Sequence, residues 1–306
     1  MSTIIKTEEQ LIDANGIQLA YDTFGNPADP PILLVMGLGM QMLAWDELFC
    51  EHLAIRGYWV IRFDNRDIGR STKFNTAVTP GLWQMLSAGL FHRPLSAPYR
   101  LKDMAADTLG LMDALGIRAA HIVGVSMGGM IAQEIAIRHP NRLLTMTSIM
   151  STTGEPHLPQ AKLNMRLRLL KRSPAEQYAY ESHIVNLFKL LNGAFYPFDE
   201  DRVRRLAANS FKRSYYPKGI VRQLAAVIAS GSRKNKLGKV NTPTLVIHGK
   251  ADPLVPVAHG QATADAIPNA RLHMIPGMAH TMPQAVWPEI IDTIVKHAAM
   301  QTGKGT

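Results

Sequence analysis

The sequence has a single cysteine, Cys50, among 306 residues. One cysteine forms no disulfide within the chain, and Cys50 has no C-x-x-C partner, so a disulfide framework is excluded. Nothing in the cysteine content argues against a reducing compartment, and we expect a cytoplasmic location. The apolar neighbours of Cys50 in LFCEHL predict a buried thiol on a helix rather than a reactive one.

Long apolar runs are also missing. No uninterrupted run reaches the roughly 18 residues that a membrane-spanning helix needs. The first residues, MSTIIKTEEQ, lack the basic segment and apolar stretch of a secretory signal peptide. We therefore expect neither export nor a membrane span. With 46% apolar and 19% charged residues, the composition is that of a globular chain with ample core.

Acidic residues are scarce in one part of the chain. The formal net charge is +9, but residues 151–240 hold 17 Lys and Arg against 6 Asp and Glu, so the rest is slightly acidic. This break predicts a basic cap at 151–240, inserted into a core formed by 1–150 and 241–306. The basic residues fall at helical spacing and form no nucleic-acid motif. We expect a solvated helical face and no nucleic-acid partner, with attraction of anionic substrates or membrane surfaces as the alternative.

Short apolar runs alternate with amphipathic helical stretches. The N-terminal residues predict an antiparallel hairpin around Asn15-Gly16, because this pair supplies the positive φ angles of a tight turn. The later alternation predicts an α/β fold: a mostly parallel sheet with helices on both faces and an inserted helical cap. Ligands of such sheets bind beyond the carboxyl ends of the strands. We expect strands at 30–36, 58–64, 121–125, 143–150, 242–249 and 270–276.

The stretch HIVGVSMGGMIAQ, residues 121–133, places three glycines around one serine where a predicted strand passes into a predicted helix. It contains Gly124-Val125-Ser126-Met127-Gly128, the pattern G-x-S-x-G. In this context the pattern predicts a sharp, strained turn that projects the serine hydroxyl above the sheet. The glycines remove Cβ atoms that would collide with the neighbouring strand and helix. A phosphate loop would need Gly-x-x-x-x-Gly-Lys, which this stretch lacks.

A nucleophilic serine needs a general base, and the base needs an acid that orients it. His280 follows the strand predicted at 270–276, and Asp252 follows the strand predicted at 242–249. The chain order Ser126, Asp252, His280 is typical of folds in which G-x-S-x-G forms the nucleophile turn. We therefore predict these three residues as catalytic nucleophile, acid and base.

Other residues fit these roles less well. The loop after the strand at 143–150 offers no carboxylate before Glu155, which leaves Asp252 as the favoured acid. Three further histidines near strands or helix ends are interpreted as structural: His139, His248 and His273.

The oxyanion of a tetrahedral intermediate needs two backbone N–H donors. We predict one at Met127, directly after the nucleophile and at the start of its helix. The second is predicted at Leu38 in Met36-Gly37-Leu38-Gly39, because two glycines let this loop approach a bound acyl group closely. This chemistry requires no metal, nucleotide or other cofactor, and none is predicted.

Together these motifs resemble the α/β-hydrolase superfamily over the whole chain. The sequence GVSMGG looks like the nucleophile turn of its esterases, lactonases, carbon–carbon hydrolases and cofactor-free peroxidase-like members. FDNRDIGRST, residues 63–72, is similar to the family's loop after the fourth strand, where such an Asp and Arg are usually structural. With VMGLGMQMLAW, the chain looks most like a bacterial branch that contains polyketide methylesterases. Many members carry His-Gly in the oxyanion loop, where this chain has Met36-Gly37.

The resemblance and the three predicted residues imply a cofactor-independent serine hydrolase that cleaves carboxylic esters through an acyl-enzyme. The same residues serve carbon–carbon bond hydrolysis, lactone hydrolysis and peroxidase-like chemistry, which are the alternatives. Halide and epoxide hydrolysis are disfavoured, because those relatives carry Asp where Ser126 stands. A non-enzymatic ligand-binding protein is a further alternative, and the intact set of Ser, Asp and His argues against it.

The residues near the predicted site indicate a small, neutral, apolar ester as substrate. Methionine fills irregular apolar space and tolerates varied ligands. Part of the apolar set is ordinary core, and the remainder is expected to line the site. The set comprises Met36, Leu38, Met40, Met42 and Met127, with Leu82, Trp83, Met85, Leu86, Leu90 and Phe91 in a long excursion at 73–98.

Overall fold

One sheet of eight strands organises the chain in the computed structural model, which describes residues 4–81, 83–85, 87, 95–169, 171 and 173–302. The strand order is β1-β2-β4-β3-β5-β6-β7-β8. β2 pairs antiparallel with β1 and β4, and the other neighbours pair parallel. The strands are β1 (Gln10–Ala14), β2 (Ile17–Phe24), β3 (Pro31–Val35), β4 (Trp59–Phe63), β5 (Ala120–Val125), β6 (Leu143–Ile149), β7 (Thr244–Gly249) and β8 (Arg271–Ile275).

The predicted N-terminal hairpin is present. β1 and β2 pair with Ala14 opposite Ile17, which leaves a two-residue turn. Asn15 has a φ of 52° and Gly16 a φ of 75°, as such a turn requires. The expected hairpin is confirmed, and β1 forms one outer edge of the sheet.

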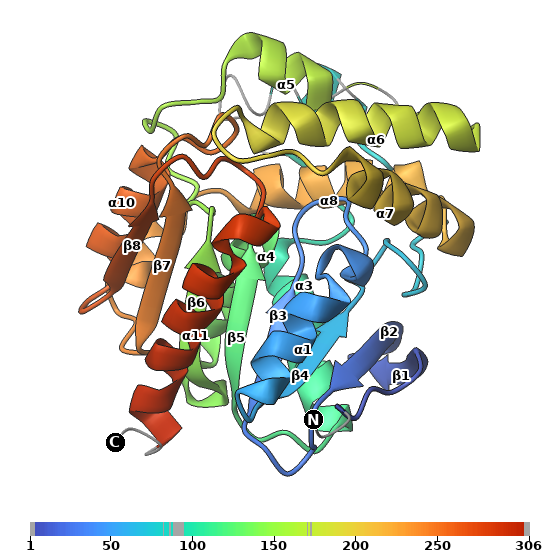
Figure 1. The fold of residues 1–306 in the computed structure, drawn as a ribbon. Helices are drawn as coiled ribbons and strands as arrows, with labels where there is room; N and C mark the ends of the chain where they lie inside the picture. The colour runs from blue at the N-terminus through green and yellow to red at the C-terminus, as the bar shows by residue number, and fades with distance from the viewer. Residues whose placement is uncertain are drawn as a thin grey trace.

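Helices cover both faces of the sheet, as the sequence predicts (Figure 1). One face carries α1 (Glu47–Ile55) and α11 (Trp287–Thr302), and the other carries α3 (Leu101–Ala114), α4 (Met127–Arg138) and α10 (Ala258–Ala266). Short 3₁₀ helices lie at η1 (Met42–Ala44), η2 (Pro140–Arg142) and η3 (Gln284–Val286).

The central strands are apolar throughout because the side chains on their two faces pack in two separate hydrophobic cores. In β3, Ile32 and Leu34 pack in the core under α1 and α11, whereas Leu33 and Val35 pack in the core under α3 and α4. This alternation follows the two-residue period of a strand that is buried on both faces. Cys50 lies in the first core, where burial raises the pKa of its thiol. It is the buried helical thiol that the sequence predicts.

A group of helices lies between β6 and β7, where the sequence predicts a cap: α5 (Leu163–Leu169), α6 (Gln177–Asn192), α7 (Glu200–Arg213), α8 (Pro217–Ser230) and α9 (Lys234–Leu237). Figure 1 shows α5, α6 and α7 above the carboxyl ends of the parallel strands. α6 packs on α7, whereas α8 contacts α3, and α9 contacts α4 and α10. None of the described helices has the length and apolar character needed to cross a bilayer.

Candidate active site

Ser126 lies at the turn between β5 and α4. Its φ of 54° and ψ of −116° are strained for a residue with a side chain. Hydrogen bonds on both sides of the residue hold this conformation: its amide donates to the Ile149 carbonyl at 2.9 Å, and its carbonyl accepts from Ser151 Oγ at 2.7 Å. The sharp turn that the sequence predicts is therefore present, and neighbouring β6 supports it.

Two glycines make this turn possible. A Cβ atom on Gly124 would collide with the carbonyl oxygen of Gly128, and one on Gly128 would collide with the carbonyl oxygen of Val35. Both collisions are with backbone, which cannot withdraw by changing a rotamer. The glycines are needed because β5, α4 and β3 approach each other this closely.

The three predicted site residues lie together above the strand ends. His280 Nε2 is 3.2 Å from Ser126 Oγ, and His280 Nδ1 is 2.7 Å from Asp252 Oδ2. The other oxygen of Asp252 accepts the amides of Leu254 and Val255 at 2.9 and 2.8 Å. With the proton on Nδ1 directed at the carboxylate, the lone pair of Nε2 faces the serine hydroxyl. The arrangement suits transfer of the serine proton to His280.

A second histidine stands behind the carboxylate. His248 Nε2 donates to the Val255 carbonyl at 2.8 Å and is 3.7 Å from Asp252 Oδ2, which is beyond hydrogen-bond reach. Burial lowers the pKa of His248, so its ring is neutral at pH 7 and forms no ion pair with Asp252. His280 is therefore the imidazole that interacts with this carboxylate. Within the described ranges, no three His, Cys, Asp or Glu side chains gather in a way that would hold a metal ion.

The glycine loop after β3 lies directly beside the nucleophile. A methyl group on Gly37 would be 3.3 Å from Ser126 Cβ. The amide of Met127 belongs to the first turn of α4, where helix amides have no partner within the helix. Neither this amide nor that of Leu38 has an acceptor elsewhere in the described part of the chain. Both are free to donate to a ligand.

Two side chains fix the position of the glycine loop, and sequence reasoning did not predict them. Asn65 Nδ2 donates to the Met36 carbonyl at 3.0 Å, and Gln223 Oε1 accepts the Gly39 amide at 2.9 Å. Asn65 comes from the loop after β4, and Gln223 from α8. These bonds hold the segment that carries Met36 in place of the His of many relatives.

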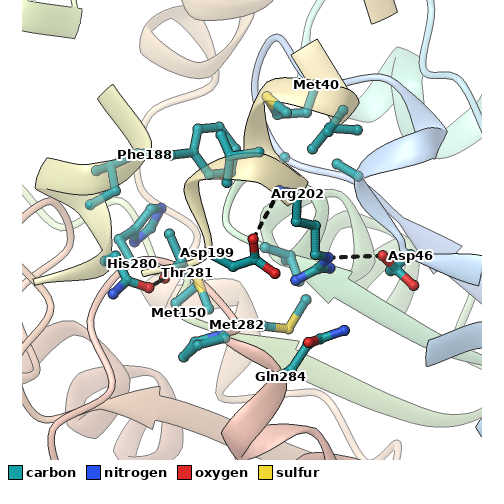
Figure 2. Close-up of a pocket in the computed structure, with 18 of the residues that line it drawn as sticks. Met40, Asp46, Met150, Phe188, Asp199, Arg202, His280, Thr281, Met282 and Gln284 are labelled. Carbon is teal, nitrogen blue, oxygen red and sulfur yellow. Dashed lines mark hydrogen bonds and ion pairs between the residues drawn. The ribbon is translucent and has the colours of Figure 1, made fainter. Parts of the chain in front are cut away.

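A cavity of about 510 Å³ opens above Ser126 and His280, beneath α6 and α7. Figure 2 shows its wall, with Phe188 on one side of His280 and Met40 farther along. Most of the lining is apolar, as predicted for the glycine loop. The apolar wall includes Met36, Leu38, Met40, Phe49, Met150, Leu187, Phe188, Leu191, Leu206, Met282 and Trp287.

The described residues of the excursion at 73–98 do not supply the wall that the sequence predicts. Trp83 is 84% exposed, and Met85 packs with Leu95 and Ala225 of α8, away from the cavity. The prediction is therefore wrong for these two residues, because α6 and α7 occupy the space above the strand ends. Met42 and Met127 are buried core residues and do not line the cavity either. The predicted positions outside the described residues are Leu82, Leu86, Leu90 and Phe91.

A polar group that the sequence did not indicate occupies one end of the cavity. Arg202 of α7 donates from Nε to Asp46 Oδ2 at 2.9 Å (Figure 2). Its guanidinium also stacks on the Trp287 ring, 4.5 Å from the ring centroid. Asp199 accepts the backbone amide of Arg202 as the N-cap of α7. Asp46 is itself the N-cap of α1. An aspartate before a helical stretch is a capping signal in a sequence, and both Asp46 and Asp199 have this position. No local signal indicates that the first turns of α1 and α7 lie side by side.

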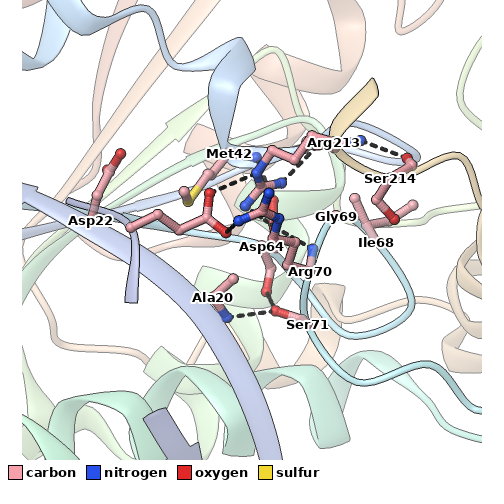
Figure 3. A network of polar contacts seen from close by, with 12 residues as sticks. Ala20, Asp22, Met42, Asp64, Ile68, Gly69, Arg70, Ser71, Arg213 and Ser214 are labelled. Carbon is pink, nitrogen blue, oxygen red and sulfur yellow. Dashed lines mark hydrogen bonds and ion pairs between the residues drawn. The ribbon is translucent and has the colours of Figure 1, made fainter. Parts of the chain in front are cut away.

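Buried ion pairs attach α7 and α8 to the loop at 63–72. Arg213 at the end of α7 forms an ion pair with Asp64 (Figure 3), with 2.6 Å between Nη2 and Oδ2. Arg222 of α8 donates twice to Asp67 at 2.8 Å. Both aspartates are fully buried, so loss of either arginine would leave a buried carboxylate without its ion-pair partner. The positive excess of 151–240 is thus partly paired with core acids, whereas exposed Arg168 of α5 fits the predicted solvated face.

Comparisons with known proteins place the chain in a family. Residues 30–283 match the family model described as alpha/beta hydrolase fold, and the chain belongs to this family. Among curated proteins it is similar to the Rhodomycin D methylesterase DauP of Streptomyces sp. (strain C5), with 31% identity over 96% of this chain and 99% of that protein. This relative fits the branch that the motifs resemble.

Solved structures show the same fold. The 2-hydroxy-6-oxo-6-phenylhexa-2,4-dienoate hydrolase of a Rhodococcus species superposes with a TM-score of 0.75 at 18% identity, over 96% of this chain and 99% of that chain. The enol-lactonase of Burkholderia xenovorans gives a TM-score of 0.73 at 23% identity, over 94% and 99%. At these identities the likeness concerns the fold alone.

Proposed function

We propose that this chain is a cofactor-independent serine esterase with Ser126, His280 and Asp252 as its catalytic triad. The observation that carries the proposal is the hydrogen-bonded series from Asp252 through His280 to Ser126 at the floor of an apolar cavity. The likeness to a methylesterase over nearly the full length of both chains supports cleavage of a carboxylic ester.

The geometry suggests how the reaction proceeds. His280 Nε2 takes the proton of Ser126 Oγ while Oγ attacks the ester carbonyl, and the amides of Leu38 and Met127 bind the oxyanion. The ester bond breaks, the alcohol leaves with the proton from His280, and the acyl group stays on Ser126. A water molecule, deprotonated by His280, then releases the acid and restores the serine. Asp252 holds the imidazole and stabilises its protonated form.

A fluorophosphonate probe separates this proposal from a ligand-binding role. Such a probe reacts with a serine that a general base activates, so we expect stoichiometric labelling of Ser126 in the folded protein. Parallel assays with p-nitrophenyl esters, lactones and vinylogous diketones compare ester cleavage with lactone and carbon–carbon bond hydrolysis. Absence of labelling together with ligand binding would favour a binding protein.

The apolar wall predicts a preference in acyl chain length. Each methylene that is buried well contributes up to about 0.8 kcal/mol until the cavity is full. Across p-nitrophenyl acetate, butyrate, hexanoate and dodecanoate, kcat/KM is expected to rise to a short or medium chain and then to fall. Fastest turnover of acetate, or preference for a charged acyl group over its neutral isostere, would contradict an apolar substrate site.

Replacing Arg202 by Met is expected to raise KM more than it lowers kcat. The substitution removes a half-buried ion pair and a cation–π contact, each contributing about 0.5–1 kcal/mol, but leaves the triad untouched. KM for the preferred ester should rise on the order of tenfold. Arg204→Met is the matched control, because Arg204 pairs with Glu200 on the outside of the same helix. Equal effects of the two substitutions would show that the cavity does not use Arg202.

The proposal extends to the division of the chain. Residues 151–240 act as a cap that shapes the substrate cavity, between core segments 1–150 and 241–306, because α6 and α7 supply much of the wall. The predicted cytoplasmic location and the absence of a nucleic-acid partner stay predictions.

A further inference from the structure

The end of α6 and the turn after it form hydrogen bonds with the loop that carries His280. The His280 amide donates to the Leu191 carbonyl at 2.8 Å. The adjacent Thr281 donates its hydroxyl to Asn192 Oδ1 at 2.9 Å. At the start of the same loop, the Tyr196 hydroxyl donates to the Pro276 carbonyl at 3.0 Å. The cap thus contacts the histidine loop at both ends.

Asn192 joins these contacts into one unit. Its Oδ1 accepts from Thr281, and its Nδ2 donates to the Tyr196 carbonyl at 2.9 Å. The residue is 4% exposed, and its partners are partly buried, so truncation would leave them without these hydrogen bonds in a place that water reaches only in part. α6 ends at Asn192, and Gly193 turns the chain with a φ of 67°. Asn192 therefore fixes the exit of the chain from α6 against the histidine loop.

The position of His280 depends on this support. Asp252 holds the ring by one hydrogen bond at Nδ1, which leaves the direction of Nε2 to the backbone at 280 and its neighbours. The distance of 3.2 Å between Nε2 and Ser126 Oγ is at the outer limit for proton transfer, so a small shift of the loop breaks the contact. Figure 2 shows Thr281 beside His280 at the cavity wall.

We infer that Asn192 is a positioning residue. Through Thr281 and the end of α6, it holds His280 Nε2 within hydrogen-bond distance of Ser126 Oγ. The cap then completes the catalytic arrangement as well as bounding the cavity. This inference rests on the proposed triad, although Asn192 itself touches none of the reacting atoms.

The test compares Asn192→Ala with the wild-type chain. Fluorophosphonate labelling and kcat for p-nitrophenyl butyrate are expected to fall about 10- to 100-fold, with little change in KM, because misplacement of a catalytic group costs that much. The pH profile of kcat/KM should shift, and the NMR signal of the His280 Nδ1 proton should change. Gln177→Ala is the matched control: it also removes a side-chain hydrogen bond of α6, to Glu181, at the opposite end of the helix.

Thr281 supplies a second pair of variants if Asn192→Ala does not fold. Thr281→Val keeps the shape of the side chain but removes the donor to Asn192, so labelling should slow. Thr281→Ser restores the hydroxyl and should recover the rate relative to Thr281→Val. Wild-type labelling rate and pH profile in folded Asn192→Ala or Thr281→Val would overturn the inference. Failure of the wild-type protein to react with the probe would instead overturn the proposed triad.

Discussion

Ser126→Ala is expected to lower kcat for ester hydrolysis by about 10⁶-fold, because no other group can form the acyl-enzyme. The thermal unfolding midpoint should stay close to that of the wild type. Ala keeps the Cβ, and the backbone bonds of the turn do not involve Oγ. Among the described residues, the hydroxyl hydrogen-bonds only with His280 Nε2. Steady-state kinetics and thermal unfolding of the purified variant check both expectations.

Ser148→Ala is the matched control for this prediction. Ser148 is a buried serine on β6, beside the nucleophile strand, and its hydroxyl has no hydrogen-bond partner among the described residues. Removing an unpaired buried hydroxyl is expected to be close to neutral for stability, so activity should persist. Substantial turnover by pure Ser126→Ala, at a level comparable with Ser148→Ala, would exclude Ser126 as the nucleophile.

Asp252→Asn is expected to lower kcat by about 10⁴-fold in a folded protein. The carboxylate accepts a hydrogen bond from His280 Nδ1 at 2.7 Å, whereas an amide in the same place can present its N–H to the ring. The imidazole then carries its proton on Nε2 and cannot accept one from Ser126. Loss of the negative charge also removes stabilisation of the imidazolium. The measurement is kcat with the same ester, together with the rate of fluorophosphonate labelling.

Glu155→Gln tests the competing acid. Glu155 is the first carboxylate after β6, but the structure pairs it with Lys234 at 2.6 Å and Thr153 at 3.2 Å rather than with His280. We expect activity close to that of the wild type. An inactive Glu155→Gln beside an active Asp252→Asn would reverse the assignment of the acid.

Parts of the fold and site were accessible from sequence because short-range geometry fixes them. Asn15-Gly16 dictates a tight turn wherever it joins two strands, and the glycines around Ser126 are needed by the backbone itself. Strand polarity then brings Asp252 and His280 to the same edge of the sheet, although His280 is 154 positions from Ser126. Parallel strands share one carboxyl edge, so a strand-by-strand prediction locates residues far apart in the chain.

The tertiary structure alone decided which elements enclose the site. The hydrophobic pattern shows that a helix has an apolar face, but it does not show which element that face packs against. For this reason the sequence predicted that the excursion containing Trp83 lines the cavity, whereas α6 and α7 line it in the structure. Long-range pairs such as Arg202 with Asp46, 156 positions apart, and Thr281 with Asn192, 89 apart, leave no local signature. Each depends on where the cap helices settle against the core, which packing of the whole chain determines.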